Sequence, residues 1–167
     1  MKKSKEKMNF LRFPTVSLSA EYLTIGHLMR RNILAYKAPP NNEGYDLICI
    51  HPDPKERSKI IKVQVKSRYQ TDSNRAVPVN GKTFNAFDYL IIVYLNIGYF
   101  YRKKPTITGL REVEFYTLPN RIARKHHRKK KSGWQILPVR DIDIERYKNG
   151  KGFEQIAKKL GVKYPTR

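Results

Sequence analysis

The sequence predicts a single α/β domain in which a mixed β-sheet is flanked by helices. A helical period near the N-terminus is followed by several strand periods and then by two further helical stretches, which is typical of helices packed on a sheet. Residues 89–95 form an uninterrupted apolar run, as expected of a central strand buried on both faces. The length of 167 residues and the hydrophobic share of 40% suffice for one core, and two full domains are not expected.

The first helix is expected from Ser17 or Ser19, either of which can cap it, to about Arg31. Residues 1–13 before it are basic and without period, and we interpret them as an N-terminal arm. Apolar residues at spacings of three and four predict the buried face of the helix, and Glu21 falls on the same face. These apolar residues are Leu18, Tyr22, Ile25, Leu28 and Met29.

Three strands are expected next. The first covers 33–36 and stops before Pro39-Pro40, and the second covers 45–50 after turn-forming residues 41–44. The third covers 60–68, where apolar and polar residues alternate as in a half-buried strand. Neighbouring strands in this order pair naturally as antiparallel partners.

After a polar loop over 70–82, further strands are expected at 87–95 and 112–118. Pro119 then opens a basic helix from about Asn120 to Lys131, ended by Gly133, and a last amphipathic helix covers 153–160. The predicted domain therefore spans 14–167. Its core lies at 17–95, and the basic and C-terminal helices lie within 119–167.

The charge balance points to a polyanionic partner. There are 35 Lys and Arg against 14 Asp and Glu, which gives a formal net charge of +21, and clustered cations gain free energy by releasing counterions from nucleic acid. No apolar stretch approaches the length of a membrane span, and the lone Cys49 fits a reducing cytoplasm. The expected phosphate-binding residues are Arg124, Lys125, Arg128, Lys129, Lys130 and Lys131, with Arg102, Lys103 and Lys104 beside a cluster of aromatic residues.

Four polar residues form a candidate metal site. Gln64 and Lys66 share one face of the third strand, strand pairing brings Asp46 beside them, and Glu21 points from the helix toward the sheet. Mg²⁺ prefers hard oxygen ligands and takes only one or two carboxylates. We expect Asp46 as direct ligand, the Gln64 side-chain carbonyl and the Val65 backbone carbonyl as further oxygens, and Glu21 in contact through water. Lys66 would position the attacking water and stabilise charge on the phosphate.

These residues resemble the PD-(D/E)XK, or restriction-endonuclease-like, nucleases. The similarity covers residues 17–95 and rests on Glu21, on Asp46 after Gly44-Tyr45, and on Gln64-Val65-Lys66 as the acid-x-lysine strand. It is closest to the branch of intron-encoded homing endonucleases and Holliday-junction-resolvase-like proteins. The resemblance implies a helix, three strands, then a helix and a strand. It further implies Mg²⁺ or Mn²⁺ as cofactor, hydrolysis of DNA, and a homodimer, since cutting both strands usually uses two sites.

The sequence departs from the common motif at two positions. Gln64 stands where most members have Glu or Asp, which removes one negative charge, and Tyr45 replaces the proline that names the motif. Two alternatives to a Mg²⁺-dependent DNA endonuclease therefore remain open. One is an inactive nucleic-acid-binding module of the same fold, and the other is a basic RNA-binding or ribosome-associated protein.

Overall fold

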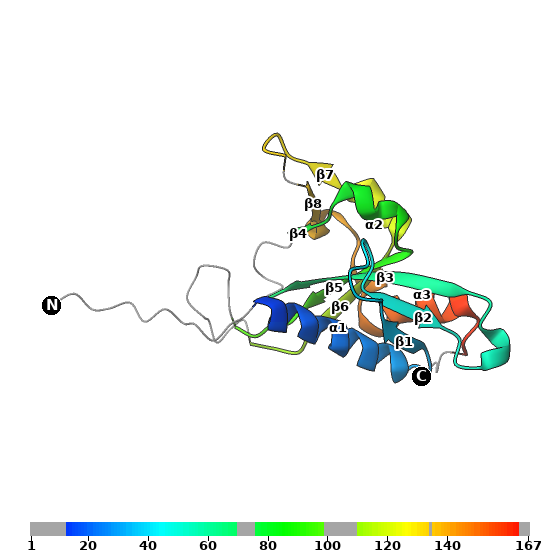
Figure 1. Cartoon of the computed structure of the whole chain (residues 1–167). Helices are drawn as coiled ribbons and strands as arrows, with labels where there is room; N and C mark the ends of the chain where they lie inside the picture. The colour runs from blue at the N-terminus through cyan, green and yellow to red at the C-terminus, as the bar shows by residue number, and fades with distance from the viewer. Residues whose placement is uncertain (1–12, 70–75, 99–109, 134, 164–167) are drawn as a thin grey trace.

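The computed structural model of the chain describes residues 13–69, 76–98, 110–133 and 135–163 (Figure 1). The expected N-terminal arm therefore lies outside the described residues, except for Phe13, which begins the first helix. No described helix has both the length and the apolar character needed to cross a membrane. The helices are α1 (Phe13–Met29), α2 (Asn120–His126) and α3 (Asn149–Leu160), and the strands are β1 (Leu34–Lys37), β2 (Leu47–Ile50), β3 (Ile60–Arg68), β4 (Ala76–Pro78), β5 (Tyr89–Tyr94), β6 (Glu114–Pro119), β7 (Arg128–Lys129) and β8 (Gln135–Pro138).

A five-stranded mixed sheet forms the centre of the molecule, as the sequence predicts. Its strand order is β1-β2-β3-β5-β6, with β3 and β5 parallel and every other neighbouring pair antiparallel. All six residues of β5 are buried, so the continuous apolar run is an interior strand of the sheet, lying between β3 and β6. A second sheet of order β4-β8-β7 lies on one side of the first (Figure 1).

Each face of the central sheet has its own hydrophobic core. On one face, Val63 and Val65 of β3 pack with Ala20 and Leu28 of α1, and α3 contributes to the same core. On the other face, Leu90 and Ile92 of β5 pack with residues of α2 and of the second sheet. Because successive strand residues point to opposite faces, the residues of β3 between the valines belong to the second face.

The buried side of α1 differs from the predicted stripe. Leu28 is fully buried as predicted, but Leu18, Tyr22 and Met29 are 42%, 57% and 45% exposed, and Ala20 and Thr24 are fully buried instead. The small side chains let the helix approach the sheet closely, and the Thr24 hydroxyl donates to the Ala20 carbonyl at 2.8 Å. Since the helix is apolar on two sides, its period alone does not select the buried one.

The basic helix is shorter than predicted. α2 ends at His126, and Arg128 and Lys129 instead pair with Ile136 and Gln135 as β7 of the second sheet. His127 takes an extended backbone there and packs its ring on Phe84, at 5.0 Å between centroids. Gly133, with φ of +84°, therefore lies in a hairpin turn rather than at the end of a helix. The predicted polar loop also contains a strand, β4.

Candidate active site

Asp46 lies where β2 separates from β3. Its backbone N–H donates to the Val63 carbonyl at 2.8 Å, and its carbonyl accepts from Ala38 N–H at 2.8 Å. Beyond this point β3 continues without β2, and the Asp46 carboxylate takes the place of a strand partner: Oδ2 accepts from Val65 N–H at 2.7 Å. Asp46 is therefore held by backbone groups on both sides, with its carboxylate at the opening between the strands.

The backbone carbonyl of Val65 points to the same opening. The even-numbered residues of β3 direct their backbone N–H and C=O groups toward β5. This is seen at Lys62 and Arg68, whose carbonyls accept hydrogen bonds from backbone N–H groups on that side of β3. Odd-numbered residues bond to the β2 side, as Val63 does with Asp46. A strand residue directs its N–H and C=O to the same edge, so the Val65 carbonyl faces the edge where its N–H meets Asp46.

Gln64 and Lys66 share one face of β3, and the Asp46 carboxylate meets the edge of that strand at the residue between them. Ile48 stands in register with Lys62 and so lies on the face of Gln64 and Lys66, whereas Asp46 lies in the bend before β2 and reaches the Val65 N–H from there. Gln64 is only 6% exposed, and its Oε1 has no hydrogen-bond partner among the described residues. Leaving such an atom unsatisfied costs about 1–3 kcal/mol, so this position favours an occupant that can bind oxygen.

Glu21 lies on α1, the helix that packs on the sheet face opposite to Gln64. It projects from α1, its side chain is 16% exposed, and its carboxylate forms an ion pair with Lys37 at the end of β1. Lys37 stands in register with Leu47, the residue after Asp46. The structure thus brings the Asp46 carboxylate to the edge of β3 at Val65, between Gln64 and Lys66. It places Glu21 on the opposite face of the sheet, at the same end of β2.

Comparison with solved structures supports the fold. The bacterial homing endonuclease I-Ssp6803I superposes with a TM-score of 0.55 and 16% identity, covering 90% of this chain and 94% of that one. The chain has the restriction-endonuclease-like fold. Hjc, a Holliday junction resolvase from Archaeoglobus fulgidus, is also similar, with a TM-score of 0.44, 10% identity, and 89% and 98% coverage. No protein-family model and no curated protein matches the sequence.

Within this restriction-endonuclease-like fold, the donor set suits a hard cation. No three His, Cys, Asp or Glu side chains cluster among the described residues, so a soft or nitrogen-rich metal site is not formed by that part of the chain. One carboxylate from Asp46, the unsatisfied amide oxygen of Gln64 and the Val65 carbonyl are all oxygens. Mg²⁺ takes such ligands and completes its octahedron with water and phosphate oxygens.

Two residues that the sequence analysis did not assign to the site help to hold it. Tyr45 packs against the second core, and the Lys62 ammonium lies 5.0 Å from its ring centroid. Gly44, with φ of +92°, leads into Tyr45, and a Cβ there would meet the Ala86 Cβ at 2.5 Å. Only glycine fits this turn, and the turn sets the direction in which Asp46 enters the sheet. The Gly-Tyr pair before Asp46 was the available sequence signal.

The expected phosphate-binding residues divide into two groups. Arg124 donates to Asn85 Oδ1 at 3.0 Å, and Arg128 pairs with Asp141 at 2.8 Å. Lys125, Lys129, Lys130 and Lys131 are exposed on α2, β7 and the following turn, while Arg102, Lys103 and Lys104 lie outside the described residues. The second sheet packs on the face that carries Gln64 and Lys66, so this basic surface and the candidate metal site open to the same side.

Proposed function

We propose that the protein is a Mg²⁺-dependent endonuclease, with Mn²⁺ as an alternative ion, that hydrolyses phosphodiester bonds in DNA in the cytoplasm. The single observation that carries the proposal is the Asp46 carboxylate, fixed by the N–H of Val65, the residue next to Gln64, whose buried Oε1 has no hydrogen-bond partner among the described residues. A cation bound between these oxygens would satisfy both of them.

Asp46, Gln64 and Val65 would hold the ion. Glu21, which the sequence led us to expect in contact with the ion's water shell, lies on the opposite face of the sheet in an ion pair with Lys37, so we give it no part in ion binding. Mg²⁺ bound there would polarise the phosphate and lower the pKa of water. In hydrolysis, the water oxygen bonds to phosphorus while one phosphorus–oxygen bond to a sugar breaks, and the departing oxygen takes up a proton. Lys66, part-exposed on the same face, would orient the water and donate to the phosphate oxygens, where negative charge grows.

Incubation of the purified chain with duplex, branched and single-stranded DNA tests the proposal, with Mg²⁺, Mn²⁺ or EDTA in parallel. We expect cleavage that needs the ion and is lost in Lys66→Ala but kept in Lys59→Ala. Lys59 is an exposed lysine just before β3, so it matches the charge change. Equal cleavage by both variants would mean that a contaminating nuclease is responsible.

The rival function is an inactive nucleic-acid-binding module. The specific observation in its favour is the neutral amide of Gln64, which binds a hard cation less tightly than a carboxylate. It is distinguished by salt-sensitive DNA binding without cleavage under any divalent ion. Stronger binding to RNA than to DNA would instead favour the RNA-binding alternative.

We further propose that two copies act together, because one site breaks one strand at a time. Exposed apolar side chains on α1, Leu18, Tyr22 and Met29, support this assembly. Residues 15–26 carry a single charged side chain, Glu21, in a chain of net charge +21, so two copies can meet there with little repulsion. Sedimentation should show a dimer for the natural chain and a monomer for Tyr22→Glu. A dimer that persists in Tyr22→Glu would place the contact elsewhere.

A further inference from the structure

An exposed lysine lies on the same face of β3 as Gln64 and Lys66. Lys62 comes two residues before Gln64, and alternation along the strand places the three side chains on one face. The second sheet and α2 cover most of this face, and Gln64 is only 6% exposed. Lys62, near the start of the strand, is exposed, so the cover does not extend to it.

Asp88 fixes the backbone of Lys62 from the β5 side. The Asp88 N–H donates to the Lys62 carbonyl at 2.8 Å, and Asp88 Oδ2 accepts from the Lys62 N–H at 2.9 Å. The other carboxylate oxygen of Asp88 lies 3.6 Å from the ammonium of Lys159 on α3. Asp88 therefore holds the main chain of Lys62 in place and leaves its side chain free to face solvent.

The Lys62 ammonium lies over the ring of Tyr45, 5.0 Å from the ring centroid. Tyr45 is the residue before Asp46, whose carboxylate meets the edge of β3 at Val65. A ring face attracts a cation without neutralising its charge. Lys62 forms no ion pair within the described part of the chain. It thus presents a positive charge beside the bend that carries the candidate ion ligand.

The position of Lys62 along β3 sets which phosphate it can meet. Val65, where Asp46 makes its contact, lies three residues after Lys62, which is about 10 Å along a strand. A DNA strand carries one phosphate for about every 3.4 Å of helix axis, so phosphates beside the cut one fall within that distance. The strand spacing therefore places Lys62 at a phosphate that flanks the cut, and Lys66 at the cut itself.

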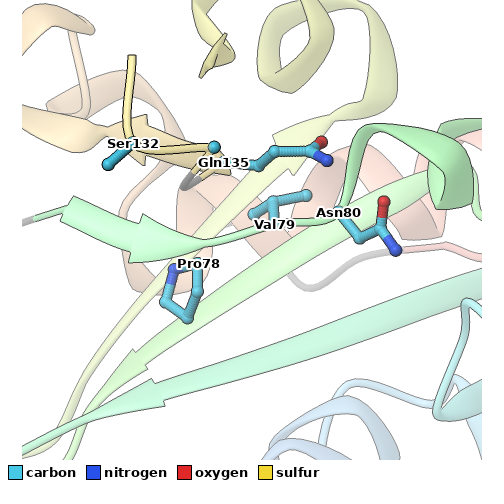
Figure 2. Close-up of a pocket in the computed structure, with 6 residues that line it drawn as sticks. Pro78, Val79, Asn80, Ser132 and Gln135 are labelled. Carbon is cyan, nitrogen blue, oxygen red and sulfur yellow. The ribbon is translucent and has the colours of Figure 1, made fainter. Parts of the chain in front are cut away.

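The hollow beside the second sheet offers no comparable charge. It has a volume of about 490 Å³, and none of its described lining side chains is charged (Figure 2). These residues are Pro78, Val79, Asn80, Ser132, Gly133 and Gln135. A phosphate gains its binding energy from cations, so Lys62 is the better placed of the two features to hold a DNA backbone.

We propose that Lys62 binds a backbone phosphate next to the phosphate that is cut, and so positions the DNA strand on the ion site. The inference rests on the proposed endonuclease function and adds a substrate-binding residue to it. A flanking phosphate does not react, so the contact is equally strong in the bound substrate and in the transition state. Loss of such a contact raises KM and leaves kcat unchanged. Lys66 differs, because it acts where negative charge grows and its loss lowers kcat.

Cleavage kinetics on a plasmid with Mg²⁺ test the inference with the full chain. Lys62→Gln keeps the aliphatic stem over Tyr45 and removes the charge. With a slope of about 0.9 per phosphate, one lost contact weakens binding about 8-fold at about 0.1 M salt, so we expect KM to rise by this factor. Lys62→Arg keeps the charge and should restore most of the natural KM. Lys59→Gln removes an exposed charge just before β3 and should leave KM near its natural value.

Neutral methylphosphonates identify the phosphate concerned. They are placed one at a time in a synthetic duplex around the cut that the plasmid digest maps. In the natural chain, neutralising the phosphate that Lys62 contacts should raise KM about as much as Lys62→Gln does. In Lys62→Gln the same replacement should cost nothing more, because the contact is already absent.

Three outcomes overturn the inference. One is a KM for Lys62→Gln equal to that of Lys59→Gln, and another is a set of losses that add at every methylphosphonate position. The third is a fall in kcat at constant KM, which would place Lys62 at the reacting phosphate. In each case Mg²⁺-dependent cleavage by the natural chain shows that the endonuclease proposal still stands. If the natural chain cleaves nothing with any divalent ion, that proposal fails and the inference falls with it. Thermal melting of each variant confirms that it is folded.

Discussion

The Asp46 carboxylate accepts from the backbone N–H of Val65 at 2.7 Å, across the gap where β2 leaves β3. This single contact serves the fold and the candidate site together. It satisfies a strand amide that has lost its β2 neighbour, and it fixes the direction of a carboxylate at the edge of β3. The hydrogen bond uses one oxygen, so a carboxylate held in this way has its other oxygen for an ion.

Substitutions at Asp46 should change cleavage and stability to different degrees. Asp46→Asn keeps an oxygen for Val65 N–H but loses the charge, so we expect near-normal stability and no Mg²⁺-dependent cleavage. Asp46→Ala should also abolish cleavage, and should unfold more easily because Val65 N–H loses its acceptor. DNA binding should stay normal or tighten in both variants, since a carboxylate facing phosphate repels it.

Cleavage assays, melting curves and binding titrations check these outcomes. The control is Asp143→Ala, which removes an exposed carboxylate elsewhere. Cleavage by Asp46→Asn at the natural rate would remove Asp46 from the ion site.

The sequence predicted the central sheet well, because strand period and buried apolar runs are local signals. β3 was predicted at its observed limits, 60–68, and the run around β5 was correctly predicted to be an interior strand buried on both faces. Alternation along β3 places Gln64 and Lys66 on one face, and the pairing of adjacent strands brings Asp46 to the edge of β3 at Val65. That these residues form an ion site stays a prediction.

The features that were missed depend on tertiary contacts. The side of α1 that faces the sheet is set by the close packing of Ala20 and Thr24. Hydrophobic period alone favours Leu18 and Tyr22 as the buried residues, because their side chains are more apolar. The basic run was assigned to a helix opened by Pro119 and ended by Gly133, yet Arg128 and Lys129 pair with the next strand, β8, which pairs in turn with the distant strand β4. The ion pair between Glu21 and Lys37 joins α1 to β1. No local sequence pattern specifies which sides of these two elements face each other.

DNA binding should weaken steeply as salt rises, by about 0.9 log unit in affinity per log unit of salt for each phosphate contacted. The structure indicates which basic residues should contribute most to this salt dependence. Lys125 and the exposed Lys129, Lys130 and Lys131 should contribute most, whereas Arg124 and Arg128 already hold Asn85 and Asp141. The triple change of Lys129, Lys130 and Lys131 to Ala should lower the salt slope by about 0.9 for each lysine that contacts a phosphate.

A matched variant controls for net charge alone. Lys55, Lys59 and Lys163 are exposed and lie outside residues 125–131, so changing them to Ala removes the same charge elsewhere. Fluorescence anisotropy with one duplex across a salt series gives both slopes. Equal slopes for the two triple variants would show that Lys129, Lys130 and Lys131 do not contact phosphate.

Cys49 should be inert in the folded protein. Its side chain is fully buried in the α1 face core, and burial raises the pKa of the thiol from 9.0 to about 12. The folded state therefore holds this proton more tightly than the unfolded state. The resulting stabilisation is complete below pH 9 and is lost as pH rises toward 12, by about 1.4 kcal/mol per pH unit. Denaturant melts from pH 8 to 11 should show this decline, and Cys49→Ala should show a shallower one. Rapid alkylation by iodoacetamide at pH 8 without unfolding would contradict the assignment.

Gln64 provides the sharpest division between an enzyme and an inactive module. Gln64→Met has a similar volume and removes the unsatisfied Oε1, so the protein should gain about 1 kcal/mol in stability and lose Mg²⁺-dependent cleavage. A residue retained for packing alone would not show this opposition between stability and activity. Calorimetric melting and plasmid cleavage measure the two quantities on the same preparation.

Gln64→Glu makes the opposite change at the same position. A buried carboxylate beside Asp46 should destabilise the ion-free protein, because two like charges then share a site of low exposure. Mg²⁺ should reverse that loss, since an ionised carboxylate binds a hard cation better than an amide oxygen does, and the melting temperature should rise with Mg²⁺ more than in the natural chain. If Gln64→Glu shows no such Mg²⁺ dependence, and the natural chain binds DNA but cleaves nothing with any divalent ion, Asp46 and Gln64 do not form a metal site. The protein would then be a nucleic-acid-binding module that keeps the nuclease fold.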